Sequence, residues 1–227
     1  MAFSETITGI GATQGFLFDC DGCLLDSMGI WGAVERETIE MAGAELTPGQ
    51  LMELRAANFH DAIRGLVALG GNASVEAIEE QAENRLMTFY RHQATAKPGA
   101  LAFVKTLHEQ GIRTAVVSAS ALRYLEAGLR RTGLWDYFDM VVSMDELHAT
   151  KADPEVFLDV CRQLGTRPGA TWGADDSLVV VRTMHAAGMH AVGTYDDDAS
   201  GTFAQLEAEA DIAVRSFAEL DAYDFAR

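Results

Sequence analysis

Two aspartates follow a short apolar run near the start of the chain, in the order Phe16-Leu17-Phe18-Asp19-Cys20-Asp21-Gly22. The apolar run is typical of a buried parallel strand, and Gly22 permits a tight turn just beyond it. In open α/β sheets, reactive groups gather beyond the carboxyl ends of the strands. We interpret Asp19 as a nucleophile and Asp21 as its acid/base partner. The alternative is that both aspartates bond free backbone N–H groups in a turn or at a helix start.

Polar residues also follow three later strand-like runs. They are Ser118 after residues 112–117, Lys151 after residues 140–143, and Asp175 and Asp176 after residues 170–173. As structural alternatives, Ser118 and Asp176 are candidate helix N-caps, Lys151 is a candidate solvated lysine, and Asp175 is a candidate turn acid. Because the carboxyl ends of parallel strands meet at one edge of a sheet, we expect these side chains to converge on one site.

Convergence of this kind creates an electrostatic problem. Four carboxylates close together cannot all stay ionised without a cation. Hard oxygen ligands select Mg²⁺, which prefers octahedral geometry and keeps several waters. Together with Lys151, the Ser118 hydroxyl and backbone N–H groups, such an ion suits a phosphoryl group, whose charge spreads over its equatorial oxygens. The sequence therefore predicts Mg²⁺-assisted chemistry on a phosphorylated compound.

The elements around these residues indicate an α/β protein: a Rossmann-like, doubly wound parallel sheet with an inserted all-helical domain. From residue 28 to about residue 93, apolar residues recur at helical spacing and no strand-like run appears, with helix starts at Thr47-Pro48 and Ser74. From Lys97 onward strands and helices alternate, which implies a parallel sheet covered on both faces. We expect a core domain of residues 1–26 and 94–227 and a helical cap of residues 27–93.

The later elements are expected at defined positions along the chain. Helices are expected over residues 101–109, 122–131, 154–164 and 178–187 and from about Gly201, and strands over 190–193 and 211–214.

Composition limits the classes of partner. The chain has 227 residues, of which 48% are hydrophobic, so it can bury a substantial core. Its 34 acidic and 17 basic residues give a formal charge of −17. Nucleic acids and anionic membrane surfaces need clustered positive charge, so we expect neither as a partner. A small phosphorylated metabolite is compatible with this charge, because a bound metal ion can dominate the local field.

Targeting signals and cysteine usage favour the cytoplasm. Residues 1–14 have no basic region and no sustained apolar core, and no apolar run approaches the roughly 20 residues of a membrane-spanning helix. The three cysteines form no disulfide framework. Cys20 and Cys23 have the spacing of a redox or zinc motif, but acidic neighbours raise a thiol pKa and only Cys161 remains as a further thiol ligand. We interpret the spacing as accidental. The oligomeric state stays open, and a monomer is compatible with the sequence.

Taken together, these residues resemble the haloacid dehalogenase superfamily of phosphotransferases. The segment Asp19-Cys20-Asp21-Gly22 resembles its first motif, Ser118 its second, Lys151 in Lys-Ala-Asp-Pro its third, and Asp175-Asp176-Ser177 its fourth. The resemblance extends from Phe16 to about Gly193. It includes a helical cap inserted after the first motif, as in the β-phosphoglucomutase-like subgroup.

The resemblance implies roles for the catalytic residues. Asp19 would attack phosphorus in line and form an aspartyl-phosphate. Asp21 would protonate the leaving oxygen and then activate the water that cleaves the intermediate. Ser118 and the N–H of Ala119 would hold phosphate oxygens, and Lys151 would orient Asp19 and neutralise charge.

The resemblance also implies a metal site. Mg²⁺ would lie between a carboxylate oxygen of Asp19, the backbone carbonyl of Asp21, and Asp176, with Asp175 in support. The family commonly has Glu at the position of Asp175, which is one methylene shorter here, and a glycine at the position of Val180.

Two further residues bear on the reaction. Mutases of the subgroup carry a His in the first cap helix, about where this chain has Trp31, so hydrolysis is favoured over sugar-phosphate mutation. Haloalkanoate dehalogenases and phosphonatases lack the acid at the position of Asp21, which disfavours both.

The substrate preference of the cap is not specified by these motifs. Arg55, Asn58 and His60 are candidates to reach over the site, because a lid must close to exclude water. The alternative is that they are solvated cap residues, and Trp31 is interpreted as packing within the cap.

We expect a Mg²⁺-dependent phosphatase that hydrolyses a small phosphomonoester. The alternative within enzymes is a phosphosugar mutase of the same family. The alternative outside enzymes is a non-catalytic phospho-acceptor or metal-binding module. Receiver domains share a doubly wound sheet with carboxylates and a lysine, but they have no large helical insertion and no acid two residues beyond the acceptor.

Overall fold

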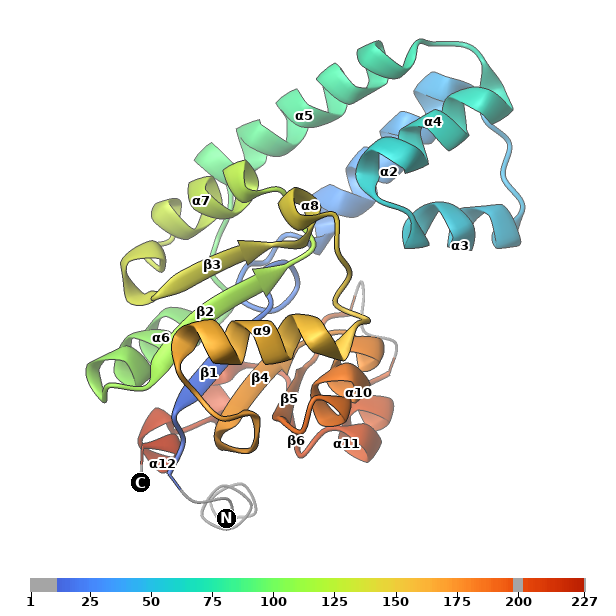
Figure 1. Ribbon diagram of the computed structural model, residues 1–227. Helices are drawn as coiled ribbons and strands as arrows, with labels where there is room; N and C mark the ends of the chain where they lie inside the picture. Colours follow the sequence, from blue (N-terminus) through green and yellow to red (C-terminus); the bar gives the residue numbers. More distant parts are fainter. Residues whose placement is uncertain (1–11, 198–201, 227) are drawn as a thin grey trace. The chain divides into compact units, whose positions relative to one another are not determined.

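The computed structural model describes residues 12–197 and 202–226 (Figure 1). The chain divides into two units, one formed by the described residues up to Met28 together with those from Ala94 onward, the other by Gly29–Gln93. The expectation that residues 1–14 are not a secretory signal falls largely on residues 1–11, which lie outside the described part. Within the part described, no helix has the length and apolar character needed to cross a membrane.

A parallel sheet with the strand order β3-β2-β1-β4-β5-β6 organises the first unit. The strands are β1 (Gly15–Phe18), β2 (Arg113–Ser118), β3 (Met140–Ser143), β4 (Thr171–Asp175), β5 (His190–Thr194) and β6 (Ile212–Val214). β1 is central, with Phe18 paired to Val116 of β2 and Ala174 of β4. All four residues of β1 are buried, as a strand covered on both faces requires. This confirms the predicted Rossmann-like sheet.

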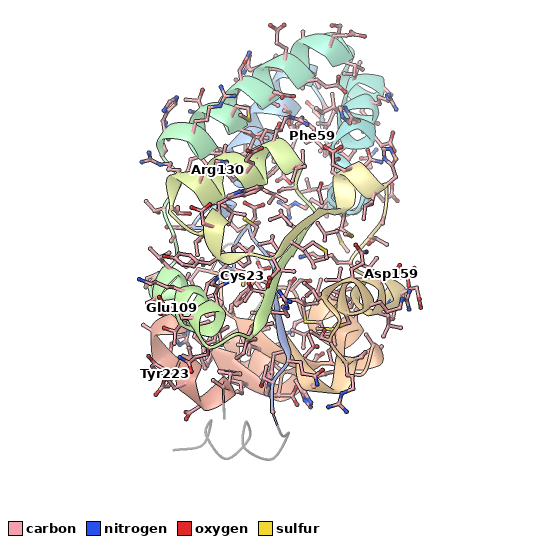
Figure 2. All side chains as sticks on the ribbon, turned by 60° about the vertical axis from the view of Figure 1, so that its left-hand side comes forward. Cys23, Phe59, Glu109, Arg130, Asp159 and Tyr223 are labelled. Carbon is pink, nitrogen blue, oxygen red and sulfur yellow. The ribbon has the colours of Figure 1, made fainter. Side chains whose placement is uncertain are left out.

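Helices cover both faces of the sheet (Figure 1). The helices of this unit are α6 (Ala100–Glu109), α7 (Leu122–Arg131), α8 (Met144–Leu147), α9 (Pro154–Leu164), α10 (Leu178–Ala186), α11 (Phe203–Glu209) and α12 (Ala222–Phe225), with 3-10 turns η1 (Trp135–Tyr137), η2 (Pro168–Ala170) and η3 (Phe217–Glu219). Leu17 faces α9 and α10, in a cluster with Phe157 and Met184. In Figure 2, Cys23 lies inside this unit, whereas Glu109 and Tyr223 lie at its periphery.

The opposite face of β1 is aromatic. The ring of Phe16 lies 5.4 Å from that of Phe103 on α6 and 5.3 Å from that of Phe225 on α12. The ring of Phe18 lies 5.9 Å from that of Phe217 in η3. Alternate residues of β1 therefore pack into two separate cores, one on each face of the sheet. This packing fixes the orientation of β1 and the position of Asp19, which follows it.

Some elements differ from those expected. The connector after β3 contains the single-turn helix α8, where the Ser143 hydroxyl accepts the Glu146 N–H at 3.2 Å. The short helix α12 and the turn η3 were not predicted either, because elements of one turn have no apolar periodicity to detect. The helix expected from about Gly201 begins at Phe203, and Gly201 itself lies outside the described residues.

The second unit is all-helical, as predicted. Its helices are α2 (Met28–Ala42, which begins at the last residue of the first unit), α3 (Pro48–Ala56), α4 (Phe59–Gly70) and α5 (Val75–His92). Thr47 forms a capping box with Gln50, and the Ser74 hydroxyl accepts the Ala77 N–H at 3.2 Å, so both predicted helix starts are confirmed. The buried residues that form its small core are Ala42, Ile63, Leu66 and Ile78.

Gly99 provides a test of how the turn before α6 packs against η3. It has φ +81°, and a Cβ there would lie 2.3 Å from the backbone nitrogen of Ala218. We expect Gly99→Ala to lower the free energy of unfolding by about 2 kcal/mol or more, measured by urea denaturation of the full chain. Gly111→Ala is the control: its φ is +78° but nothing lies within 4 Å of the added Cβ, so only the backbone cost of about 1 kcal/mol is expected. Equal losses in the two variants would contradict this packing.

Candidate active site

A buried lysine joins two of the predicted aspartates. Lys151 Nζ lies 2.5 Å from Asp19 Oδ1 and 2.7 Å from Asp175 Oδ2, and the three side chains are 11%, 5% and 1% exposed. Asp19 directly follows β1, Asp175 ends β4, and Lys151 comes from the connector before α9. The structure therefore brings together residues far apart in sequence, and the alternative of a solvated surface lysine is wrong.

The charges in this cluster influence one another strongly. Burial raises the pKa of Asp19 to about 7; Lys151 opposes the shift, and Asp175 and Asp21 add to it. Burial alone would lower the pKa of Lys151, but the charges of Asp175 and Asp19 outweigh it and hold that pKa well above its usual value. Lys151 is consequently a fixed positive charge beside Asp19 over the whole physiological pH range.

Asp176 adds a further buried carboxyl group. It is 8% exposed, and burial, followed by the charges of Asp175 and Asp19, raises its pKa to about 9. A Cβ on Gly22, whose φ is +82°, would lie 2.7 Å from Asp176 Oδ2, so this carboxyl lies against the turn after β1. Ser177, not Asp176, is the N-cap of α10. The N-cap alternative for Asp176 is therefore wrong.

Asp175 has donors on both carboxylate oxygens. Oδ2 accepts from Lys151, and Oδ1 accepts the N–H of Ser177 at 2.9 Å. Asp175 therefore fills the expected turn position and belongs to the charge cluster at the same time.

Two serines that sequence reasoning missed hold the carboxylate of Asp21. The Ser27 hydroxyl donates to Oδ1 at 2.6 Å, and the Ser120 hydroxyl donates to Oδ2 at 2.6 Å. Ser27 lies on the loop that carries Asp21, and Ser120 follows Ser118 in the sequence Ser-Ala-Ser. The sequence signal for Ser120 was the second hydroxyl in Ser-Ala-Ser after β2. That both serines bond Asp21 depends on how the two loops meet, which the sequence does not specify.

The candidate phosphate-binding residues end β2. Ser118 is the last residue of the strand and is buried, its hydroxyl accepting the N–H of Ser120 at 3.2 Å. Ala119 follows and is exposed. The N-cap of α7 is Ala121, so the N-cap alternative for Ser118 is wrong.

The buried thiols next to the aspartates are poorly suited to redox chemistry. Burial, followed by the charges of Asp21 and Asp19, raises the pKa of Cys20 well above its usual value, and burial with Asp19 does the same for Cys23. Because the thiolate is the reactive form, these surroundings suppress the reactivity of both thiols. This agrees with our interpretation of the Cys-x-x-Cys spacing as accidental.

The candidate cap residues all have partners within the helical unit. Arg55 forms an ion pair with Glu35, and His60 contacts Glu79. The Asn58 side chain caps α4 by accepting the Asp61 N–H at 2.9 Å.

Trp31 has partners inside the helical unit. Its indole N–H donates to the hydroxyl of Tyr90 at 2.9 Å, and its ring lies 6.1 Å from that of Phe59 (labelled in Figure 2). These contacts agree with the interpretation of Trp31 as a packing residue.

The oxygen donors of the cluster fit Mg²⁺. In residues 12–197 and 202–226, no three His, Cys, Asp or Glu side chains form a metal-binding group. Mg²⁺ needs no such group, since it is commonly bound by one or two carboxylates together with waters and phosphate oxygens. Asp19 and Asp175 contact Lys151, and Asp176 adds a third buried carboxyl group on which the charges of the other two act. The ionised cluster therefore has an excess of negative charge that a divalent cation would offset.

The chain belongs to the haloacid dehalogenase-like hydrolase family, whose model matches residues 13–188. Among curated relatives, hexitol phosphatase B of Escherichia coli K12 is 27% identical over 212 residues, with 92% of this chain and 94% of the relative covered.

Solved structures share the fold. CbbY from Rhodobacter sphaeroides in complex with phosphate has a TM-score of 0.75 at 21% identity, with 92% of this chain and 96% of that one covered. A putative β-phosphoglucomutase from Thermotoga maritima has a TM-score of 0.69 at 24% identity, with 89% and 94% covered. The chain thus shares with these structures the α/β fold that the sequence predicted.

The raised pKa of Asp176 predicts how the metal-free protein responds to pH. The folded protein holds this proton more tightly than the unfolded chain does, so stability falls as the pH rises from the unfolded value of ~3.9 towards the folded value of about 9. In EDTA at pH 8, Asp176→Asn should therefore be more stable than the wild type by more than ~1 kcal/mol, and the difference should shrink towards pH 4. Urea denaturation across this pH range measures it. The exposed Asp26→Asn is the control, and a gain of stability that does not vary with pH would contradict the assignment.

Proposed function

We propose that this hydrolase is a phosphatase that cleaves a small phosphomonoester through an aspartyl-phosphate on Asp19. The observation that carries the proposal is the contact of Lys151 with Asp19 and Asp175 at the end of the central strand. Lys151 holds one carboxylate oxygen of Asp19 and leaves the other to attack phosphorus. The relative hexitol phosphatase B, which aligns with 92% of this chain, supports the same reaction class.

In the first step, Asp19 forms a bond to phosphorus as the bond from phosphorus to the alcohol oxygen breaks, and Asp21 gives its proton to that oxygen. In the second step, Asp21 takes a proton from water, whose oxygen attacks phosphorus and releases phosphate and Asp19. The hydroxyls of Ser27 and Ser120 orient Asp21 for both steps. The Ser118 hydroxyl and the N–H of Ala119 hold the phosphoryl oxygens, and Lys151 balances their charge.

A divalent cation completes the proposed site. Asp19, Asp176 and the backbone carbonyl of Asp21 would hold Mg²⁺, with Asp175 in support through its bond to Lys151. When bound, the ion supplies positive charge that stabilises the phosphoryl oxygens. The uncompensated buried carboxyl of Asp176 supports this assignment.

The two units are proposed to be a catalytic core of residues 1–26 and 94–227 and a substrate-selecting cap of residues 27–93. Arg55, Asn58 and His60 remain candidates for substrate contact, each needing to exchange its present partner to reach a ligand. We propose a phosphorylated sugar or sugar alcohol as substrate, because the relative from Escherichia coli is a hexitol phosphatase. The cytoplasm is the proposed compartment, since the described cysteines are free thiols.

Asp19→Asn tests the nucleophile. The amide keeps the size of the side chain but removes the attacking anion, so kcat for para-nitrophenyl phosphate should fall on the order of 10³-fold or more. Steady-state phosphate release measures the effect. Asp26→Asn, an exposed aspartate in the same loop, should keep wild-type turnover. Retained turnover in Asp19→Asn would remove this residue from the nucleophile role.

Asp21→Asn separates the two steps. The variant should still form the phosphoenzyme slowly, because para-nitrophenolate leaves without a proton, yet fail to break it down, because no base activates water. Intact-mass spectrometry should then find a trapped phosphoryl group on Asp19. An unmodified chain with normal turnover would contradict the acid/base role of Asp21.

A screen of phosphorylated metabolites, begun with hexitol phosphates, tests substrate and metal together. Phosphate release should require Mg²⁺ and stop in excess EDTA; full activity in EDTA would contradict the metal site.

Addition of glucose-1-phosphate with a sugar bisphosphate tests the alternative of a phosphosugar mutase. A mutase would form the isomer instead of free phosphate.

A further inference from the structure

A second buried ion pair lies at the carboxyl end of the sheet, outside the set of residues assigned above. Lys97 Nζ bonds Asp196 Oδ2, and the two side chains are 16% and 6% exposed. By its sequence the acidic run Asp196-Asp197-Asp198 is typical of a solvated loop, whereas the structure buries Asp196. Lys97 belongs to no predicted motif. Burying this pair removes both charged groups from water, which costs free energy. We therefore ask whether the pair acts on the nearby site.

The sheet order places this pair at the end of the sheet that carries Asp176. The backbone N–H of Lys97 donates to Leu24 O at 2.8 Å, which sets Lys97 against the loop that follows β1. Asp196 follows the end of β5. Because β4 lies between β1 and β5, the pair extends across the end of β4, where Asp176 follows the strand.

The turn that carries Lys97 is held on several sides. Its carbonyl accepts the N–H of Ala100 at 3.0 Å, and the hydroxyl of Ser216 donates to Pro98 O at 2.9 Å. Gly99 packs so closely on η3 that no Cβ fits there. The backbone at Lys97 is therefore held in one conformation, which fixes the position of its ammonium group.

We propose that Asp196 and Lys97 together set the affinity of the site for its divalent cation. Asp196 adds negative potential beside Asp176 and strengthens cation binding, whereas Lys97 fixes Asp196 in place and limits the strength of that attraction. This inference rests on the proposed function, which places the cation at Asp19 and Asp176. Charges next to the direct ligands of a metal commonly change its affinity tenfold or more, because a divalent ion responds strongly to the local field.

The proposal predicts shifts of opposite sign, which a purely structural ion pair would not give. Asp196→Asn should weaken Mg²⁺ binding by about tenfold, and Lys97→Gln, which keeps a donor for Asp196 but removes the charge, should strengthen it by a similar factor. The double variant Lys97→Gln/Asp196→Asn removes both charges and should return close to the wild-type affinity, as should Lys97→Arg. Isothermal titration of Mg²⁺ into the full chain at low salt measures each value, with no substrate present.

Controls separate local from general effects. Lys105→Gln and Glu109→Gln change the same charges in an exposed pair on α6 and should alter the affinity less than twofold. Urea denaturation checks that each variant is folded. If Lys97→Gln fails to fold, Asp196→Asn and the double variant decide, since the double variant leaves no unpaired buried charge.

The outcomes distinguish this inference from the proposed function. If the wild type binds Mg²⁺, Asp176→Asn does not, and the Lys97 and Asp196 variants stay within twofold of the wild type, the inference alone is overturned. Shifts of the same sign in both single variants also overturn it. If the wild type fails to bind Mg²⁺, or Asp176→Asn binds it as the wild type does, the cation site itself is wrong and the inference falls with it.

Discussion

The contact of one ammonium group with two carboxylates is the interaction on which the first unit depends. Lys151 reaches Asp19 and Asp175 from a connector; Asp19 directly follows β1, and Asp175 ends the neighbouring strand β4. Without that positive charge, the buried carboxylates of Asp19 and Asp175 would lie near each other with no counter-ion, at a cost of several kcal/mol. The lysine thus allows the parallel sheet to bring acidic strand ends together, and the same charge balance is the basis on which we propose Asp19 as the acceptor of a phosphoryl group.

Asp176 and Asp21 show how the remaining acidic groups are accommodated by different means. Asp21 is partly exposed and is held by hydroxyl donors, whereas Asp176 is buried against the turn at Gly22. One aspartate is therefore positioned by neutral hydrogen bonds, and burial raises the pKa of the other. This division suits a site in which one carboxyl moves protons and another binds metal.

The fold could be predicted from the sequence because each strand and helix has its own local signal. The apolar run before Asp19 and the β-branched run before Ser118 both form buried strands. The convergence of Lys151 with the aspartates followed from chain topology together with family resemblance. The bonds of Ser27 and Ser120 to Asp21 could not be predicted, since they depend on how two loops meet.

Pairing across distant loops also hid the contact of Lys97 with Asp196, because neither residue lies in a periodic element whose burial can be inferred from spacing. Helix α8 was missed for a related reason, since four residues carry too little pattern. Sequence patterns specify the faces of long elements, whereas the partners of single side chains in loops are specified only by the assembled fold.

The aromatic core beneath β1 has a consequence for how the protein is made. Phe16 and Phe18 are covered by Phe217 and Phe225, which the ribosome adds after every residue of the site. Phe103 of α6 covers part of this face earlier in synthesis, and the rest is covered only after Phe217 and Phe225 are added, because closing so long a loop is slow. Packing around β1 is therefore complete only once residues 217–225 are in place, and until then its partly covered phenylalanines are a target for chaperones or for aggregation.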